Sequence, residues 1–352
     1  MRVLFAATRG AGHVGPLVPF AHACLRAGHQ VLFAAPASAA PVVARAGLPH
    51  RVTGEAPAEV VEDVLWARAA SSEEVIRDVF VGLHAGTALP GMIDAVAAWR
   101  PDVIIRESME LASVLAADRF DVPVVRVGIH LDSATDSTGW LEDVAAAALG
   151  VEPKRLREGP LLTRSPGDAE AGVHRFRTEV ARRRSPELVY VTFGSEAPGS
   201  PHFPSVYRRA IEALADYPVL MTIGDRRDPA ELGPLPPNVR VEPWVAQADV
   251  MPRAAAIVSH GGSGSTLTAL AAGVPQAFLP LFVDGPANAR RVAELGAGIL
   301  VGDDLAADVR ALIEDPRYAL AAALAADEIA TLPPVDDAVA VIQRSAAGHA
   351  IR

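Results

Sequence analysis

The feature that most constrains this chain is a short apolar run that meets a glycine-rich turn and continues as a helical pattern. The run covers residues 254–259, and the turn reads His260-Gly-Gly-Ser-Gly-Ser-Thr266. A buried strand that turns through glycines into a helix is a unit of parallel α/β sheets. The turn presents bare backbone N–H groups and the positive end of the helix dipole. The sequence therefore predicts a phosphate-binding turn between a strand and a helix.

Alternating strand and helix patterns extend over most of the 352 residues, which are too many for one ordinary core. The expected strands cover 3–7, 31–35, 103–105, 124–127, 188–193, 219–223, 239–242, 256–259, 276–279 and 298–301. The expected helices cover 16–27, 41–46, 71–99 with breaks, 111–119, 173–183 and 336–347. Two successive sets of this kind predict an α/β protein with two facing Rossmann-like, doubly wound domains and a cleft between them.

A change of composition separates the two sets. Residues 151–187 mix Arg, Pro, Gly and Glu without sustained periodicity. We place an interdomain linker at 161–187, between domains at 1–160 and 188–334, and a final helical segment at 335–352.

Composition argues against several classes of function. The net charge of −10 disfavours a general binder of nucleic acids or anionic membranes. The single cysteine, Cys24, rules out an internal disulfide and a cysteine-based metal cage. The first apolar run is too short for a signal peptide, and the apolar stretch 267–283 is broken by glycine and proline. We therefore expect a cytoplasmic protein.

Four side chains flank the glycine-rich turn: Trp244 and Gln247 before it, and Asp284 and Asn288 after it. With them, the segment resembles the nucleotide-sugar signature of the inverting UDP/TDP-sugar glycosyltransferases of the GT-B fold (the UGT-like, family 1 type). The resemblance is closest to bacterial enzymes that glycosylate antibiotics and other natural products. It implies metal-independent transfer of a sugar, with a deoxysugar allowed, from a TDP- or UDP-sugar to a hydroxyl of a small aglycone. It also implies an acceptor-binding first domain, a donor-binding second domain and a final helix that crosses back to the first.

The resemblance assigns the donor site residue by residue. Trp244 offers its face to the base, Val245 reads the base edge through its backbone, and Gln247 lies at the ribose. The turn, with the Ser265 or Thr266 hydroxyl, holds the diphosphate. The implied donor-binding residues are Gly194, Ser195, Trp244, Val245, Gln247, His260, Gly261, Gly262, Ser263, Gly264, Ser265, Thr266, Asp284 and Asn288.

The chain departs from the family at one donor position. Many relatives have Gln directly after the Asp, whereas Gly285-Pro286 follows Asp284 here. The missing amide weakens the case for a glucose-like donor and leaves room for a deoxysugar. No D-x-D triplet occurs, so a metal-clamped diphosphate is not supported. We expect neither a metal nor a cofactor, because the helix N-terminus and His260 can neutralise the leaving group.

A second glycine loop follows the first strand. Gly10-Ala-Gly12-His13-Val-Gly15 matches the G-x-G-x-x-G fingerprint of dinucleotide enzymes. That fingerprint also requires an acidic residue about 20 positions further on. The first acidic residue of this chain is Glu55. A nicotinamide cofactor is therefore not favoured.

In the glycosyltransferase resemblance, the same loop carries the catalytic base. His13 is then the general base that takes the proton of the acceptor hydroxyl. A carboxylate is expected behind it, and both Glu107 and Glu110 are candidates. The expected acceptor-binding residues are Gly12, Met109 and His130.

Two alternative functions stay open. A nucleotide-sugar epimerase of GT-B form would need acid–base carboxylates beside the sugar, and a non-catalytic nucleotide-sugar-binding partner would not need His13. The expected partners are the donor and a small-molecule acceptor, without nucleic acid or membrane, and a homodimer is allowed. The other histidines, His84 among them, lack ligand spacing and are interpreted as structural or solvated.

Overall fold

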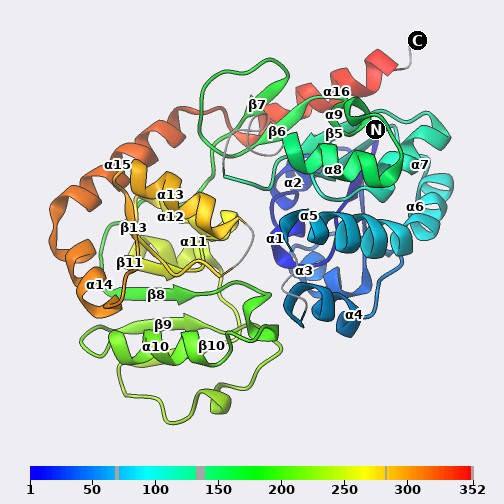
Figure 1. The fold of residues 1–352 in the computed structure, drawn as a ribbon. Helices are drawn as coiled ribbons and strands as arrows, with labels where there is room; N and C mark the ends of the chain where they lie inside the picture. Colours follow the sequence, from blue (N-terminus) through cyan, green and yellow to red (C-terminus); the bar gives the residue numbers. More distant parts are fainter. Residues whose placement is uncertain (68–70, 132–138, 282–283, 350–352) are drawn as a thin grey trace. The chain divides into compact units, whose positions relative to one another are not determined.

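The computed structural model describes residues 1–67, 71–131, 139–281 and 284–349, and Figure 1 shows their helices and strands. The chain divides into two compact units. Unit 1 consists of Met1–Ile129, Ser133–Phe176 and Pro333–Arg352, and unit 2 consists of His130–Asp132 and Arg177–Leu332. Each unit is built on one parallel sheet, which confirms the predicted α/β class.

The sheet of unit 1 has the strand order β3-β2-β1-β4-β5-β6-β7, and all its strand pairs are parallel. The strands are β1 (Arg2–Ala6), β2 (Gln30–Ala35), β3 (His50–Val52), β4 (Val103–Glu107), β5 (Val124–Val127), β6 (Leu161–Thr163) and β7 (Val173–Arg175). The chain winds outward in both directions from the β1–β4 pair. Ligands bind α/β sheets at the carboxyl ends of strands beside such a switch point.

Alternate side chains of the central strand pack on opposite faces of this sheet. Val3 and Phe5 join a core with α2 (Val18–Arg26) and α16 (Ala338–His349). Leu4 and Ala6 join a second core with α6 (Gly86–Trp99) and α7 (Ala112–Phe120). Parallel strands covered on both faces are unbroken apolar runs, as in this sequence. The C-terminal helix is therefore part of the core of unit 1.

The longest helix of unit 1 runs from Ser72 to Trp99. A capping box between Ser71 and Glu74 starts it at α5 (Ser72–Glu74), a π-helical segment η3 (Val75–Ala85) follows, and α6 completes it. Among the described residues, it is the one helix long and apolar enough to cross a membrane, with a mean hydropathy of 1.4. It packs against α7 and α8 (Gly139–Leu149), as a core helix of an α/β unit does.

The shorter helices of unit 1 connect these elements. They are α1 (Ala11–Val14), α3 (Ala40–Arg45), α4 (Ala58–Glu62) and α9 (Pro153–Arg157), with a π-helical turn at Asp63–Ala67 and 3-10 turns at Ala37–Ala39 and Val335–Asp337.

The sheet of unit 2 has the order β10-β9-β8-β11-β12-β13, again with parallel pairs. Its strands are β8 (Leu188–Thr192), β9 (Val219–Thr222), β10 (Val239–Glu242), β11 (Ala254–Ser259), β12 (Gln276–Phe278) and β13 (Gly298–Leu300). Its helices are α10 (Ser205–Ala213), α11 (Gln247–Val250), α12 (Ser263–Ala272), α13 (Gly285–Glu294), α14 (Leu305–Glu314) and α15 (Pro316–Thr331), with 3-10 turns at Ala197–Gly199, Pro229–Leu232 and Met251–Arg253. This strand order is the Rossmann order.

The helices of unit 2 cover both faces of its sheet. Val191 of β8 packs with α10 and α14, whereas its neighbour Tyr190 packs with α12. Phe278 of β12 faces α12, α13 and α15. The glycine-rich turn thus leads from the central strand β11 directly into a helix that the core holds in place.

The structure differs from the sequence prediction mainly in residues 139–176. The helices α8 and α9 and the strands β6 and β7 were not expected, and the expected helix at 173–183 is wrong because Val173–Arg175 forms β7. Both strands pair within the sheet of unit 1, so part of the segment placed as a linker at 161–187 is sheet. Strands of three residues are too short to leave a periodic signal.

Candidate active site

The first candidate site lies where β1 and β4 end, in unit 1. After β1, the chain turns at Gly10, whose φ of 94° favours glycine, and α1 then carries His13. The parallel register pairs Ala6 of β1 with Arg106 of β4, which brings the two loops together. His13 Nδ1 lies 3.1 Å from Glu107 Oε1. The geometry therefore favours Glu107 over Glu110 as the carboxylate behind His13.

Every oxygen of the Glu107 carboxylate has a hydrogen-bond donor. The backbone N–H and hydroxyl of Thr8 donate to Oε1 at 3.3 and 3.1 Å, and the backbone N–H of Met109 donates to Oε2 at 2.6 Å. Complete burial opposes ionisation, but the charge and hydrogen bond of His13 and these backbone donors outweigh it and hold the Glu107 pKa below its ordinary value. A carboxylate on Nδ1 fixes the imidazole and leaves Nε2 as the proton acceptor.

Glu110 has a different environment, one turn further on. Its carboxylate accepts the backbone N–H of Ser113 at 3.1 and 3.3 Å, in the first turn of α7. Burial raises the Glu110 pKa to about 7, the hydrogen bonds of Ser113 oppose that rise, and the nearby negative charge of Glu107 adds to it. Glu110 therefore titrates near neutrality, while Glu107 stays ionised.

Two aromatic side chains that the sequence did not single out complete this first candidate site. The ring of Phe80 packs against His13 with centroids 5.6 Å apart, and His84 packs edge-on against Phe80 at 5.7 Å. Burial, then the charges of His13 and Arg9, lower the His84 pKa to about 4, against a smaller opposing effect of Glu107. His84 is thus a neutral, buried member of the site. The only signal in the sequence was the i, i+4 spacing of the two rings on one helical pattern.

The three expected acceptor residues lie in different surroundings. Gly12 is exposed on α1, and a side chain there would meet nothing within 4 Å. Met109 is buried in the same apolar cluster as Ile76 and Leu111. His130 belongs to the short segment His130–Asp132 of unit 2, so the structure does not bring it together with the other two in one unit.

The second candidate site is the turn between β11 and α12, in unit 2. Gly261 has a φ of 86°, and Gly262 forms the N-terminal cap of α12. A Cβ on Gly262 would lie 2.3 Å from His260 Nε2, and one on Gly194 would lie 2.8 Å from His260 Cε1. Only glycine lets the backbone approach the imidazole this closely on both sides. The backbone at Gly194 and the backbone at Gly262 therefore both pack against the His260 ring.

His260 is neutral in this environment. Burial lowers its pKa below the ordinary value, and the charge of Asp284 and the hydrogen bond with the Thr192 backbone oppose that shift only in part. Its ring can therefore serve a diphosphate as a hydrogen-bond donor rather than as a cation.

Asp284 and Asn288 close the turn from the side of α13. Asp284 Oδ2 accepts hydrogen bonds from the Ser263 backbone and hydroxyl at 3.2 and 2.9 Å and from Asn288 at 3.1 Å. The buried Asn288 amide also donates to the Gly261 carbonyl at 2.7 Å and to the Ser263 hydroxyl at 3.0 Å. Asn288 thus ties α13 to the glycine turn, a supporting role, whereas Asp284 reaches the N-terminus of α12.

The remaining donor residues differ in exposure. Trp244 is 52% exposed, so its face is accessible to a ligand, and Val245 next to it is half-buried. Gln247 donates to the Ser265 hydroxyl at 2.8 Å, while Thr266 is fully buried. This favours Ser265 over Thr266 as a phosphate ligand. Ser195 is half-buried and its carbonyl accepts a hydrogen bond from Arg226 at 2.9 Å, and Gly264 is exposed on α12.

No group of three or more His, Cys, Asp or Glu side chains that could hold a metal ion occurs among residues 1–67, 71–131, 139–281 and 284–349.

Comparisons with known proteins match both units. Family models described as the N-terminal and C-terminal domains of erythromycin biosynthesis protein CIII-like proteins match residues 22–176 and 209–343. Elloramycin glycosyltransferase ElmGT of Streptomyces olivaceus is 32% identical over 97% of this chain and 96% of its own. L-demethylnoviosyl transferase of Streptomyces niveus is 33% identical over 86% of each.

Solved structures give the same result. Glycosyltransferase SsfS6 of Streptomyces sp. SF2575, complexed with thymidine diphosphate, has a TM-score of 0.78 and 27% identity over 98% of this chain and 99% of its own. SnogD of Streptomyces nogalater has a TM-score of 0.78 and 25% identity with the same coverage. The two parallel-sheet units and these structural relatives define a GT-B glycosyltransferase.

Within that class, this chain belongs to the EryCIII-like glycosyltransferases of antibiotic biosynthesis. The expected GT-B fold and glycosyltransferase activity are therefore confirmed, and the dinucleotide enzyme, the epimerase and the non-catalytic partner are not supported.

Proposed function

We propose that this enzyme transfers a sugar, with inversion of the anomeric configuration, from a TDP- or UDP-sugar to a hydroxyl of a small natural-product aglycone. The observation that carries the proposal is the 3.1 Å approach of His13 Nδ1 to the buried carboxylate of Glu107. A histidine held in this way has its second nitrogen available as a general base near neutral pH.

In the proposed reaction, His13 Nε2 takes the proton from the acceptor hydroxyl. The oxygen attacks the anomeric carbon and forms the new C–O bond, while the bond from that carbon to the diphosphate oxygen breaks and its electron pair leaves with the nucleoside diphosphate. Attack opposite the leaving group inverts the configuration. Glu107, whose carboxylate touches Nδ1, stabilises the imidazolium that results.

The leaving diphosphate requires compensation of its negative charge. The N-terminus of α12 supplies backbone N–H groups and a positive dipole end, and Ser265 supplies a hydroxyl. Neutral His260 adds a hydrogen-bond donor from the same turn. We therefore propose that transfer proceeds without a metal ion. We also propose that the enzyme acts in the cytoplasm.

Two observations support a TDP-deoxysugar as donor. SsfS6, the structural relative above, is complexed with thymidine diphosphate, and another relative is named demethyllactenocin mycarosyltransferase, from Streptomyces fradiae. In this chain, a Cβ on Gly285 would lie only 2.4 Å from the His260 carbonyl oxygen, so a side chain at this position would collide with the backbone of the glycine-rich turn. A pocket without that amide has fewer partners for sugar hydroxyls.

The test uses purified enzyme, a panel of TDP- and UDP-sugars and a panel of aromatic and macrocyclic aglycones, with and without EDTA. We expect an inverted product by NMR, unchanged activity in EDTA, and a loss of about 100-fold or more in kcat for His13→Gln. Calorimetry should show unchanged TDP binding to that variant. An active His13→Gln enzyme, a retained anomer, or activity abolished by EDTA would each contradict the proposal.

A further inference from the structure

A fully buried arginine directly precedes the carboxylate that meets the proposed base. Arg106 occupies the last position but one of β4, immediately before Glu107, in a strand that is otherwise apolar up to that point. Arginine is rarely buried completely unless its donors are satisfied, because a guanidinium stays charged and its removal from water is costly. Its position in the sheet therefore calls for a specific role.

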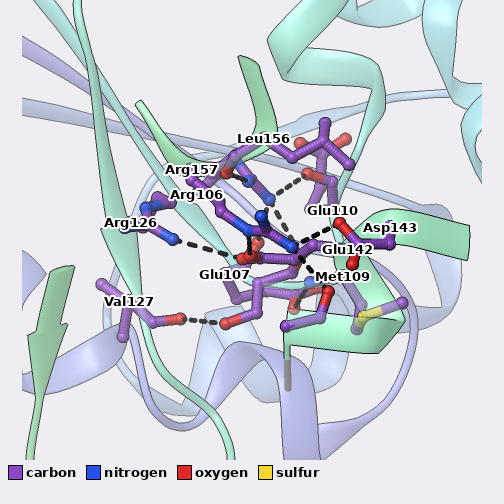
Figure 2. Close-up of polar contacts among 12 residues, drawn as sticks. Arg106, Glu107, Met109, Glu110, Arg126, Val127, Glu142, Asp143, Leu156 and Arg157 are labelled. Atoms are coloured by element: carbon purple, nitrogen blue, oxygen red, sulfur yellow. Dashed lines mark hydrogen bonds and ion pairs between the residues drawn. The ribbon is translucent and has the colours of Figure 1, made fainter. Parts of the chain in front are cut away.

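The hydrogen bonds of Arg106 all go to backbone carbonyls. Nη1 donates to the carbonyls of Glu107, Ser108 and Glu110 at 3.1, 2.9 and 3.2 Å (Figure 2). Nη2 donates to the carbonyl of Leu156, on α9, at 2.5 Å. One side chain thus gathers three carbonyls of the turn 107–110 around a single nitrogen and ties that turn to a helix that follows 50 residues later.

Two neighbouring arginines both bind the carboxylate of Glu142. Arg126, the register partner of Arg106 on β5, donates to Glu142 Oε1 at 3.2 Å, and Arg157 donates to Glu142 Oε2 at 2.9 Å (Figure 2). These bonds fix α8 against β5 and α9. They do not reach the turn, so Arg126 offers a matched control: a largely buried arginine of the same network, one strand away.

The turn that Arg106 holds contains the groups that orient the Glu107 carboxylate. The Met109 N–H donates to Glu107 Oε2 at 2.6 Å from within it. The Ser108 hydroxyl pins the same turn to β5 by donating to the Val127 carbonyl at 3.1 Å. A shift of this backbone would move Glu107 away from His13.

We propose that Arg106, assisted by Ser108, is a positioning residue for catalysis: it holds the turn 107–110 so that the Glu107 carboxylate meets His13 Nδ1. The inference rests on the proposed role of His13 as general base. Among the described residues, Glu107 and His84 interact electrostatically with His13, and Arg9 acts on His84. Of these groups, Glu107 belongs to the turn that Arg106 holds.

The pH dependence follows from that geometry. The base is active when its imidazole is neutral, and a carboxylate beside an imidazole stabilises the protonated form. If the turn loosens, the imidazole stays neutral to lower pH, so the acid limb of the pH–rate profile moves to lower pH. At the same time kcat falls, because the imidazolium formed during transfer loses its partner.

The experiment compares Arg106→Lys, Ser108→Ala and Arg126→Lys in the full-length enzyme. Lysine keeps the charge but has no fork to serve both groups of carbonyls. For Arg106→Lys we expect about a 10-fold loss of kcat, an unchanged KM for the donor and an acid limb at lower pH. Ser108→Ala should change kcat and the acid limb in the same direction and by less. Arg126→Lys should lower Tm and leave the profile in place.

A second readout observes His13 directly. In enzyme labelled with 15N-histidine, His13→Gln identifies the His13 signals, and the ring nitrogen shifts report the tautomer. Arg106→Lys should reduce the population with the proton on Nδ1, whereas Arg126→Lys should not. If Arg106→Lys does not fold, the Ser108→Ala variant tests the proposal by itself. This substitution removes only one hydrogen bond, from a half-buried side chain.

The outcomes separate this inference from the proposed function. An active His13→Gln enzyme would overturn the proposed function. An inactive His13→Gln enzyme, together with wild-type profiles and tautomers for Arg106→Lys and Ser108→Ala, would leave that function intact and show that Arg106 serves stability alone. If Arg126→Lys moved the acid limb of the pH–rate profile as far as Arg106→Lys does, the positioning role of Arg106 would also be overturned.

Discussion

Gly285 contacts the backbone of His260 so closely that a Cβ on the glycine would lie 2.4 Å from the His260 carbonyl oxygen. The contact joins the start of α13 to the glycine turn that precedes α12. Asn288 reinforces it from the next turn of α13 by donating to the Gly261 carbonyl. The candidate donor site at the turn between β11 and α12 is thus shaped by backbone packing as well as by side chains.

We predict that Gly285→Ala weakens TDP binding by about 10-fold and lowers the free energy of unfolding by about 1–3 kcal/mol, because the added methyl must displace α13. Calorimetry and urea unfolding measure the two effects. Gly302→Ala is the control in the same unit, since a Cβ there would meet only the Asp308 carboxylate at an ordinary 3.7 Å. Equal results for the two variants would show that the close contact relaxes without consequence.

Trp244→Ala should weaken TDP binding by about 10-fold or more, because stacking of a base on an aromatic ring contributes about 1–3 kcal/mol. Unfolding should change little, since the side chain is 52% exposed. Trp244→Phe should recover most of the affinity. Binding that is unaffected by the alanine variant, measured by calorimetry, would exclude Trp244 as the base platform.

Phe80→Ala should reduce kcat by about 10-fold, because the ring packs against His13 at 5.6 Å and restricts the imidazole. TDP binding should be unchanged, since Phe80 belongs to unit 1, whereas the glycine-rich turn at 260–266 belongs to unit 2. Phe80→Leu, which fills much of the same volume, should lie between wild type and the alanine variant. Steady-state kinetics with both substrates varied provides the measurement, and an unchanged kcat would contradict the packing role.

The raised pKa of Glu110 predicts that the free energy of unfolding depends on pH. Burial raises its pKa from 4.5 to about 7 in the folded state, so between these values the folded protein binds more protons than the unfolded chain. This group therefore stabilises the fold below about pH 4.5, and its contribution is lost as pH rises towards 7 and above. Glu110→Gln should be more stable than wild type at pH 8 by on the order of 1–3 kcal/mol, relative to their difference at pH 4.5.

Urea unfolding of both proteins at the two pH values checks this prediction. Glu107 provides the contrast, because its lowered pKa contributes stability above its unfolded pKa that is lost as pH falls through the folded value. Glu107→Gln should therefore lose stability relative to wild type at neutral pH and lose little at low pH. If the free energy of unfolding changed with pH equally in wild type and Glu110→Gln, the pKa of Glu110 would not be raised in the folded state.

Most central strands were predictable from the sequence, because a strand covered on both faces leaves an unbroken apolar run. The run at 188–193 contains β8, and the run at 219–223 contains β9. The three-residue strands β6 and β7 were not predictable, because their pairing partners, rather than their own side chains, make them strands.

The sequence by itself determined the parts of the site that depend on local chemistry: the glycine turns, His13 beside the first of them, and the strand–turn–helix unit that carries His260. Glycines and periodicity act over a few residues, so the sequence records them directly. Only the tertiary structure decided between Glu107 and Glu110, brought Phe80 and His84 to the base, and placed Arg106 under its turn. Each of these depends on the register of β1 against β4 or on packing between distant segments, which no local pattern encodes.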